Sequence, residues 1–65
     1  MYYQAIKGAW EKQKEYINSI EDPNVKQSVQ TPTGAATGEA TRLQMENPED
    51  SELIDNILKQ VLNGN

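Results

Sequence analysis

The sequence of 65 residues contains neither cysteine nor histidine. Disulfide bonds are therefore excluded, and so are zinc and haem sites built on Cys or His ligands. The same two absences remove the most reactive nucleophile and the usual base that would activate a serine. We expect a protein that is not an enzyme and that holds no cofactor and no metal.

Long apolar runs and an excess of positive charge are also missing. No stretch approaches the roughly 18 apolar residues that a membrane span needs, and the first residues lack the basic start and apolar run of a signal peptide. Six Lys and Arg against ten Asp and Glu give a formal charge of −4, which does not suit direct binding to a phosphate backbone. We expect no direct contact with nucleic acid or membrane, and a location in the cytoplasm or in an assembly made there, such as a virion.

The first 20 residues have the periodicity of an amphipathic helix. Apolar side chains recur in steps of three and four, which predicts a helix over about 2–20 with Gln13 as the single polar interruption of its stripe. Three small residues, Ala5, Gly8 and Ala9, leave a low place on this helix where another backbone could approach. Gly8 lowers the helix propensity there by roughly 1 kcal/mol relative to Ala.

The C-terminal part of the chain predicts a second helix, over about 48–62. Asn47 is expected to be its N-cap, with Pro48 at the first helical position and acidic residues in the first turn. Asn63 and Gly64 provide a stop signal. The apolar stripe of this helix is two residues wide and consists of Leu53, Ile54, Ile57, Leu58, Val61 and Leu62.

Residues 22–46 contain few large apolar side chains. Burying Val25, Val29, Leu43 and Met45 would stabilise the segment by about 6 to 12 kcal/mol. Ordering its backbone costs on the order of 25 to 50 kcal/mol. A short helical turn around residues 40–45 could dock through Leu43 and Met45, but the segment as a whole is expected to be an extended linker or strap that another surface orders.

Two patterns in the chain are similar to ligand-binding motifs but lack their essential residues. Gly34 and Gly38 are one residue too close together for a phosphate-binding loop, and Glu39 stands where the lysine would be. A group of acids near the second helix lacks the spacing of an EF-hand loop, and we interpret it as solvated charge that complements the helix dipole. These acids are Glu46, Glu49, Asp50, Glu52 and Asp55.

The sequence therefore predicts an all-α fold class with an extended irregular segment and little independent core. The chain divides into an N-terminal amphipathic helix (1–21), an extended linker or strap (22–46) and a C-terminal amphipathic helix (47–65). Two helices packed as a hairpin would leave part of each apolar stripe exposed, and exposed apolar patches often mark contact sites.

The first functional hypothesis is a non-enzymatic structural or adaptor subunit that folds on docking to a larger protein assembly, with several copies bound. In its length and lack of cysteine the chain resembles accessory structural proteins of viruses and phages, so a minor virion component is one form of this hypothesis. Two alternatives are a small acidic regulatory protein that binds and inhibits a basic or nucleic-acid-handling partner, and a self-assembling helical oligomer. The residues expected to bind the partner are Tyr3, Ile6, Trp10, Ile17, Ile20, Leu53, Ile54, Ile57, Leu58, Val61 and Leu62.

Overall fold

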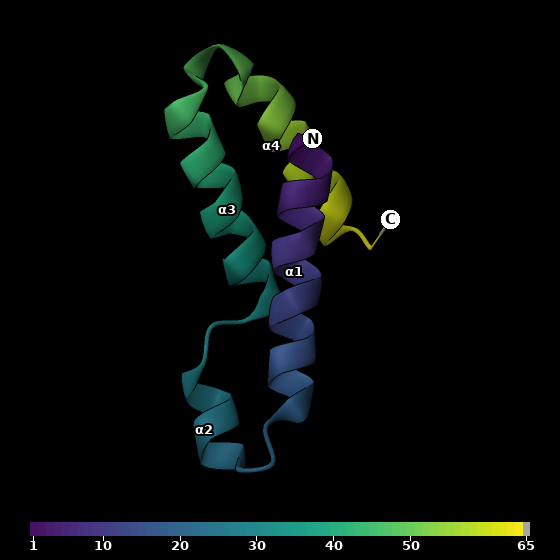
Figure 1. Ribbon diagram of the computed structural model, residues 1–65, viewed down its shortest axis with the longest axis vertical. Coiled ribbons are helices and arrows are strands. Elements are labelled where there is room, and N and C mark those ends of the chain that lie inside the picture. The colour runs from purple at the N-terminus through teal and green to yellow at the C-terminus, as the bar shows by residue number, and fades with distance from the viewer. Residues whose placement is uncertain (65) are drawn as a thin grey trace.

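A computed structural model describes residues 1–64 of the chain and has helices along most of that length (Figure 1). No strand occurs in residues 1–64, so the expected all-α class is confirmed. The elements, in chain order, are the α-helices α1 (Tyr2–Ser19), α2 (Pro23–Ser28) and α3 (Pro32–Glu46), the short 3₁₀ helix η1 (Pro48–Asp50) and the α-helix α4 (Ser51–Leu62).

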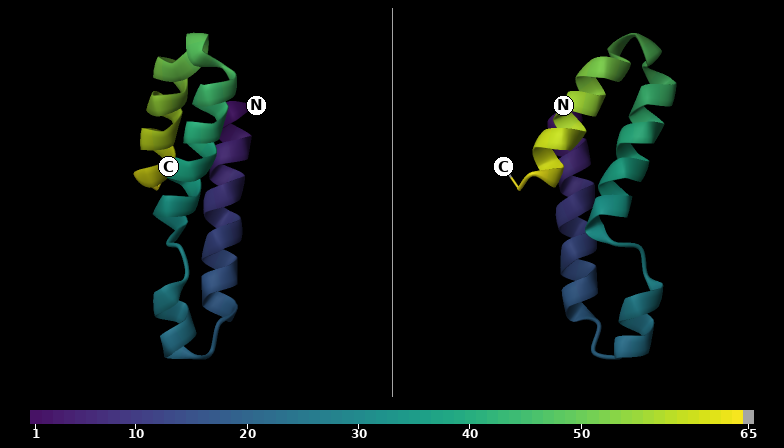
Figure 2. Two further views of the ribbon diagram at one scale, coloured as in Figure 1. Left: turned by 90° about the vertical axis from the view of Figure 1, so that its left-hand side faces the viewer. Right: turned by 180° about the vertical axis from the view of Figure 1, so that it is seen from behind.

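Helices α1, α3 and α4 each pack against the other two. The turn containing η1 reverses the chain, so that α4 runs back beside α3 (Figure 2). Helix α2 lies at the far end of the molecule, next to the end of α1, and forms no comparable interface with the other described helices. The result is an elongated body with extents of 42 × 22 × 15 Å.

The core lies where the three long helices meet. Ile6 from α1 and Ile54 from α4 are the largest fully buried side chains, and α3 faces them with small residues. Tyr2, Tyr3, Ala5, Trp10, Ile57 and Leu58 pack around this centre and are partly buried. The buried residues are Ile6, Ala36, Ala40, Leu43, Ile54 and Val61.

The expectation that residues 22–46 form an extended linker is wrong, because two helices occupy most of that segment. Each begins at a capping residue followed by proline, a pair that favours a helix start. At α3, the Thr31 hydroxyl oxygen accepts a hydrogen bond from the Gly34 backbone N–H at 3.1 Å. At α2, the Asp22 carboxylate accepts one from the Asn24 backbone N–H at 2.9 Å.

Small side chains explain how α3 packs without many large apolar residues. Ala36, Ala40 and Leu43 follow the i, i+4, i+7 spacing of one helical face and are all buried. Alanine side chains let the backbone of α3 lie close to its neighbours. Of the large residues expected to matter here, Val25 and Met45 remain 45% and 79% exposed, so their burial contributes little.

The end of α1 is joined to the segment before α3 by a polar contact. Gln13 interrupts the apolar stripe of α1, and its Nε2 donates a hydrogen bond to the backbone carbonyl of Gln30 at 2.7 Å. The polar interruption of the stripe therefore ties α1 to the connection between α2 and α3.

Helix α1 ends at Ser19, and Asp22 has extended backbone, as expected for a residue that precedes proline.

The predicted C-terminal helix is present over the expected residues, but it starts differently. Residues 48–50 form a 3₁₀ turn and the α-helix begins at Ser51. The Asn47 side chain caps the preceding helix instead, because its Nδ2 donates to the Leu43 carbonyl at 3.1 Å. At the other end, Gly64 has a φ of 82°, a conformation that glycine adopts without strain.

Candidate functional site

The structure places the predicted partner-binding residues in three different environments. Ile6 and Ile54 are fully buried and Val61 is 3% exposed, so these three side chains form the core of the chain itself. The partly buried residues that pack around them are Tyr3, Trp10, Ile57 and Leu58. In the folded chain, the three buried side chains present almost no surface to a partner, whereas the four partly buried ones keep part of their surface exposed.

The accessible members of the predicted set lie far from one another. Ile17 and Ile20 are half-buried at the end of α1 next to α2. Leu53 is 52% exposed in the first turn of α4, at the opposite end of the molecule, and Leu62 is 38% exposed in its last turn. The structure therefore does not bring the two predicted stripes together into one external surface.

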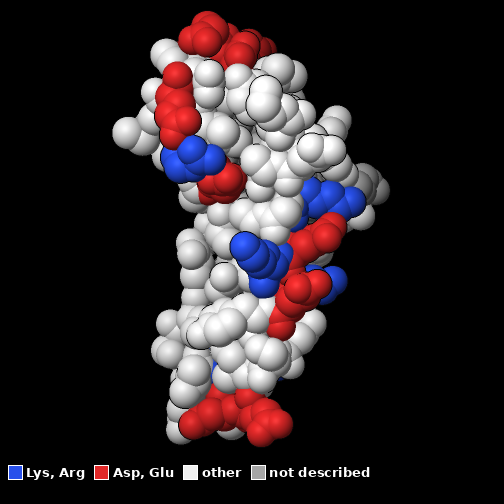
Figure 3. All heavy atoms as spheres, in the orientation of Figure 1, with Lys and Arg blue, Asp and Glu red and all other residues white. Residues whose placement is uncertain are grey.

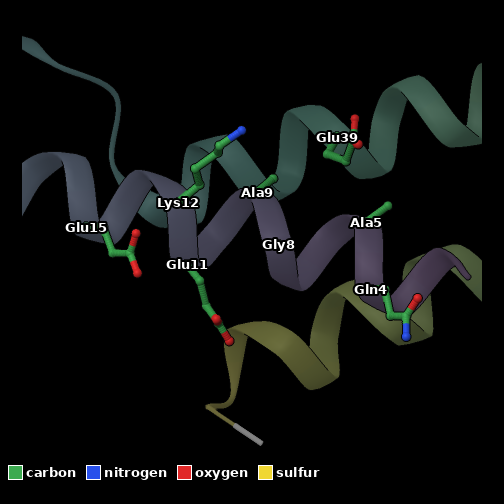
Figure 4. A pocket seen from close by; sticks show the side chains of 8 residues that line it. All are labelled: Gln4, Ala5, Gly8, Ala9, Glu11, Lys12, Glu15 and Glu39. Carbon is green, nitrogen blue, oxygen red and sulfur yellow. The ribbon is translucent and has the colours of Figure 1, made fainter.

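An open groove of about 580 Å³ runs along the outer side of α1, and we call it the α1 groove. Its floor is made by the small residues Ala5, Gly8 and Ala9, with Glu39 of α3 on one flank (Figure 4). Lys12 points to the same side as Glu39, whereas Gln4, Glu11 and Glu15 point away from it. The lining residues are Gln4, Ala5, Gly8, Ala9, Glu11, Lys12, Glu15 and Glu39.

Gly8 gives the groove its low floor without being required by the fold. A Cβ atom added at Gly8 would meet no atom of the described residues within 4 Å. The residue lies in the interior of α1, is exposed and has no positive φ. A glycine there costs roughly 1 kcal/mol of helix stability relative to Ala, and no packing within the chain offsets that cost.

Two of the carboxylates that line the groove are paired within the chain. Glu39 accepts hydrogen bonds from Arg42 Nε at 2.7 Å and Nη2 at 3.0 Å. These bonds lower the pKa of Glu39, with the charge of Arg42 acting in the same direction and desolvation opposing it. Glu11 lies 3.8 Å from Lys7, a weak contact between exposed groups.

Arg42 is held between two carboxylates on the solvent side of α3. Besides its contacts to Glu39, its Nη1 donates to Glu46 Oε2 at 2.7 Å. The hydrogen bonds from Glu39 and Glu46 raise the pKa of Arg42 further above its ordinary value, and their negative charges add to the effect. The guanidinium therefore fixes the position of Glu39 at the edge of the groove.

The acidic residues around α4 are partly engaged within the chain. Asp50 accepts a hydrogen bond of 2.6 Å from the Tyr2 hydroxyl, and Asp55 lies 3.1 Å from Lys59. Acidic side chains gather over the turn between α3 and α4, at the upper end of the molecule in Figure 3. Within residues 1–64, no group of three or more Asp and Glu side chains is placed to hold a metal ion.

The sequence indicates the floor of the groove but not its flanks. The small residues Ala5, Gly8 and Ala9 were recognisable by their spacing on a predicted helix. Glu39 reaches the groove because α3 packs beside α1, and nothing in the spacing of residues 31–41 taken as a linker indicates this. The signal that was available is Thr31 followed by Pro32, which marks a helix start.

No protein-family model, curated protein or solved structure matches this chain. None of the helices in residues 1–64 combines the length and apolarity needed to cross a membrane.

Proposed function

We propose that this chain is a non-enzymatic structural or adaptor subunit that docks to a larger protein assembly through the α1 groove. The observation that carries the proposal is the α1 groove, on whose floor Gly8 lies between Ala5 and Ala9 with open space for a Cβ atom. A glycine that weakens its own helix, at a position where a Cβ would meet no atom of the described residues within 4 Å, has a physical reason if a partner occupies the space above it. A close-packed helix or strand of a partner would do so.

We further propose that docking uses a folded three-helix body rather than a chain that orders only on contact. The supporting feature is the core shared by α1, α3 and α4, with Ile6 and Ile54 at its centre. Amide hydrogen exchange on the isolated chain tests this point. Slow exchange from Ala36 to Leu43 is expected, and exchange at unstructured rates across α3 would favour folding on docking instead.

Site-specific photo-crosslinking in the native source of the protein tests the docking site. A photoreactive residue at Lys12 lies in the groove, whereas one at Thr41 lies on the exposed side of α3, outside it. We expect a discrete protein adduct from position 12, its loss when Gly8 is also changed to Gln, and no matching adduct from position 41. Equal adducts at both positions, or adducts indifferent to Gly8→Gln, would contradict docking through the groove.

Self-association is the rival use of the same surface. A symmetric pair of α1 helices would also cover the small residues, and cyclic dimers are the commonest oligomers. Sedimentation of the purified chain separates the two functions. A monomer at micromolar concentration agrees with docking to a different protein, while a dimer that Gly8→Gln dissociates identifies the second copy as the occupant.

A further inference from the structure

We propose that Asn63 and Gly64 form a site of spontaneous deamidation, at which the Asn63 side chain loses ammonia and becomes aspartate or isoaspartate. The substrate is the chain itself and the co-reactant is water. The proposal is independent of the α1 groove and of docking to a partner. The chemistry of the dipeptide, its exposure and its place at the end of α4 carry it.

The reaction uses the backbone nitrogen of Gly64 as its nucleophile. This nitrogen gives its proton to a base in the solvent and attacks the side-chain carbonyl carbon of Asn63. A carbon–nitrogen bond forms, the bond to the side-chain nitrogen breaks, and that nitrogen takes up a proton and leaves as ammonia. Water then opens the cyclic imide at either of its carbonyl carbons. One amide is thus hydrolysed to one carboxylate, nothing is oxidised or reduced, and the formal charge of −4 gains one negative unit.

Gly64 makes the attacking nitrogen accessible. Glycine has no Cβ atom to shield its nitrogen and restricts backbone rotation less than any other residue. Proline has no N–H to lose, and the branched side chains of Val and Ile crowd the backbone beside them. The other asparagines of the described chain are followed by Ser19, Val25, Pro48 and Ile57.

The geometry at the end of α4 permits the attack. Both residues are exposed, and no hydrogen bond or ion pair to another described residue holds the Asn63 side chain. Asn63 is the C-cap with φ −81° and ψ 1°, so its ψ must rotate to bring the Gly64 nitrogen to the side chain. That rotation breaks one exposed bond, from the Gly64 N–H to the Val61 carbonyl at 3.1 Å. At Asn18 and Asn56, which lie within α1 and α4, the same rotation would interrupt the helix itself.

The modification alters the last turn of α4 next to a core residue. Isoaspartate adds one carbon atom to the main chain before the Gly64 nitrogen, which moves the Gly64 N–H away from its acceptor. Either product also places a negative charge at the carboxyl end of the helix, where the helix dipole disfavours it. Val61, which supplies the acceptor, is only 3% exposed and belongs to the core. Deamidation therefore loosens the attachment of α4 to the core.

The experiment incubates the purified full chain at neutral and at mildly alkaline pH and follows its mass over days. Digestion after Lys59 releases a peptide that begins at Gln60, and fragmentation of this peptide locates the mass increase. We expect conversion at Asn63 before any other described asparagine, faster at the higher pH, with isoaspartate detected by an isoaspartyl methyltransferase assay. Earlier conversion of another described asparagine, or an unchanged residue 63, would overturn the assignment.

Two variants make the same change at two exposed positions of the chain. Asn63→Gln lengthens the side chain by one carbon, so the imide ring no longer closes readily, whereas Asn56→Gln lengthens a side chain within α4. We expect Asn63→Gln to abolish the early release of ammonia and Asn56→Gln to retain it. Gly64→Ala should slow the release, because its Cβ shields the nitrogen. Equal release from the two Gln variants would contradict the proposal.

Unfolding in guanidinium chloride tests whether the fold leaves the site open. Conversion at Asn63 in the folded chain should be within about tenfold of its rate in the unfolded chain, because only one exposed hydrogen bond must break first. If folding slows Asn63 as strongly as it slows Asn56, the end of α4 protects the site and the proposal is wrong.

The effect on α4 is measured on the isoaspartate form, separated from the unmodified chain by ion exchange. We expect its thermal unfolding midpoint to lie below that of the unmodified chain and below that of Asn63→Asp, which adds the charge without the extra main-chain carbon. A midpoint equal to that of the unmodified chain would overturn the loosening of α4.

Discussion

The Tyr2 hydroxyl donates a hydrogen bond of 2.6 Å to Asp50 Oδ2, across 48 positions of the sequence. This bond joins the first turn of α1 to η1, just before α4 begins. It therefore links the two ends of the chain that the sequence presents as separate helices. Its donor is a phenol and its acceptor a carboxylate, and hydrogen bonds to a charged group are the stronger kind.

Replacing Tyr2 with Phe should lower the thermal unfolding midpoint. The change removes the hydrogen bond to Asp50 and keeps the aromatic ring that packs against the core. Tyr16→Phe is the matched control, because Tyr16 is 50% exposed on the same helix and lies outside the core cluster. Differential scanning calorimetry should show a larger decrease for Tyr2→Phe than for Tyr16→Phe, and equal midpoints would mean that the bond does not contribute to stability.

The same bond predicts a loss of stability at alkaline pH. Hydrogen bonding to Asp50, followed by desolvation and the negative charges of Asp50 and Glu49, raises the pKa of Tyr2 from 10.0 to about 12. Because the folded-state pKa is the higher one, this stabilisation is complete below pH 10 and is lost as the pH rises to about 12. NMR titration of ¹³C-labelled tyrosine should show this pKa, and Asp50→Asn should bring it back towards 10.

At acid pH the contact between Arg42 and Glu39 should make a measurable, small difference. Arg42 lowers the pKa of Glu39 below its ordinary value of 4.5. The stabilisation is therefore present above pH 4.5 and is lost as the pH falls through the lowered pKa of the folded state. The thermal midpoints of the wild type and Arg42→Gln should differ at neutral pH and converge below the folded-state pKa. At neutral pH, Lys7→Gln, which removes a contact of 3.8 Å between exposed groups, should lower the thermal midpoint less than Arg42→Gln does.

The sequence predicts the two terminal helices because their apolar residues repeat with helical spacing. The expectation of a linker fails at α3 because it considers only large apolar side chains as core residues. Ala36 and Ala40 are 0% and 1% exposed and pack as completely as Ile6. The pair Thr31 and Pro32 marks the start of α3, where the Thr31 side chain caps the helix and Pro32 is its first residue. Capping residues therefore predict this region better than hydrophobicity does.

The candidate site shows the same division between local and tertiary information. The spacing of Ala5, Gly8 and Ala9 on one helix predicts a low surface, because three small residues on one face need no other element to define it. The position of Glu39 beside that surface depends on how α3 packs against α1. The contact between Tyr2 and Asp50 likewise depends on the three-helix arrangement. No pattern of neighbouring residues in the sequence indicates the position of Glu39 or the bond between Tyr2 and Asp50.

Enlarging Ala40 tests whether α3 belongs to the core. Ala40→Leu adds volume at a buried site and should destabilise the chain by about 1 to 3 kcal/mol. Thr41→Leu places the same side chain at the next, exposed position of α3 and should change stability much less. Urea unfolding followed by circular dichroism measures both. If the two variants unfold at the same urea concentration, the segment does not pack as described and a loose linker becomes the better description.

The two exposed glycines allow stability and docking to be separated. Gly8→Ala and Gly38→Ala should each stabilise the fold by about 1 kcal/mol, because both lie in helix interiors and a Cβ at either position meets open space. Gly34→Ala should gain less, since its Cβ would lie 2.9 Å from Gln30 Cγ and the Gln30 side chain would have to move. Thermal and urea unfolding of the three variants measure these differences.

A glycine kept for a partner should show opposite effects on two properties. Gly8→Ala should raise the stability of the fold and weaken docking, whereas Gly38→Ala should raise stability alone. If Gly8→Ala destabilises the isolated chain, the glycine serves the fold and the main support for the α1 groove as a docking site is removed.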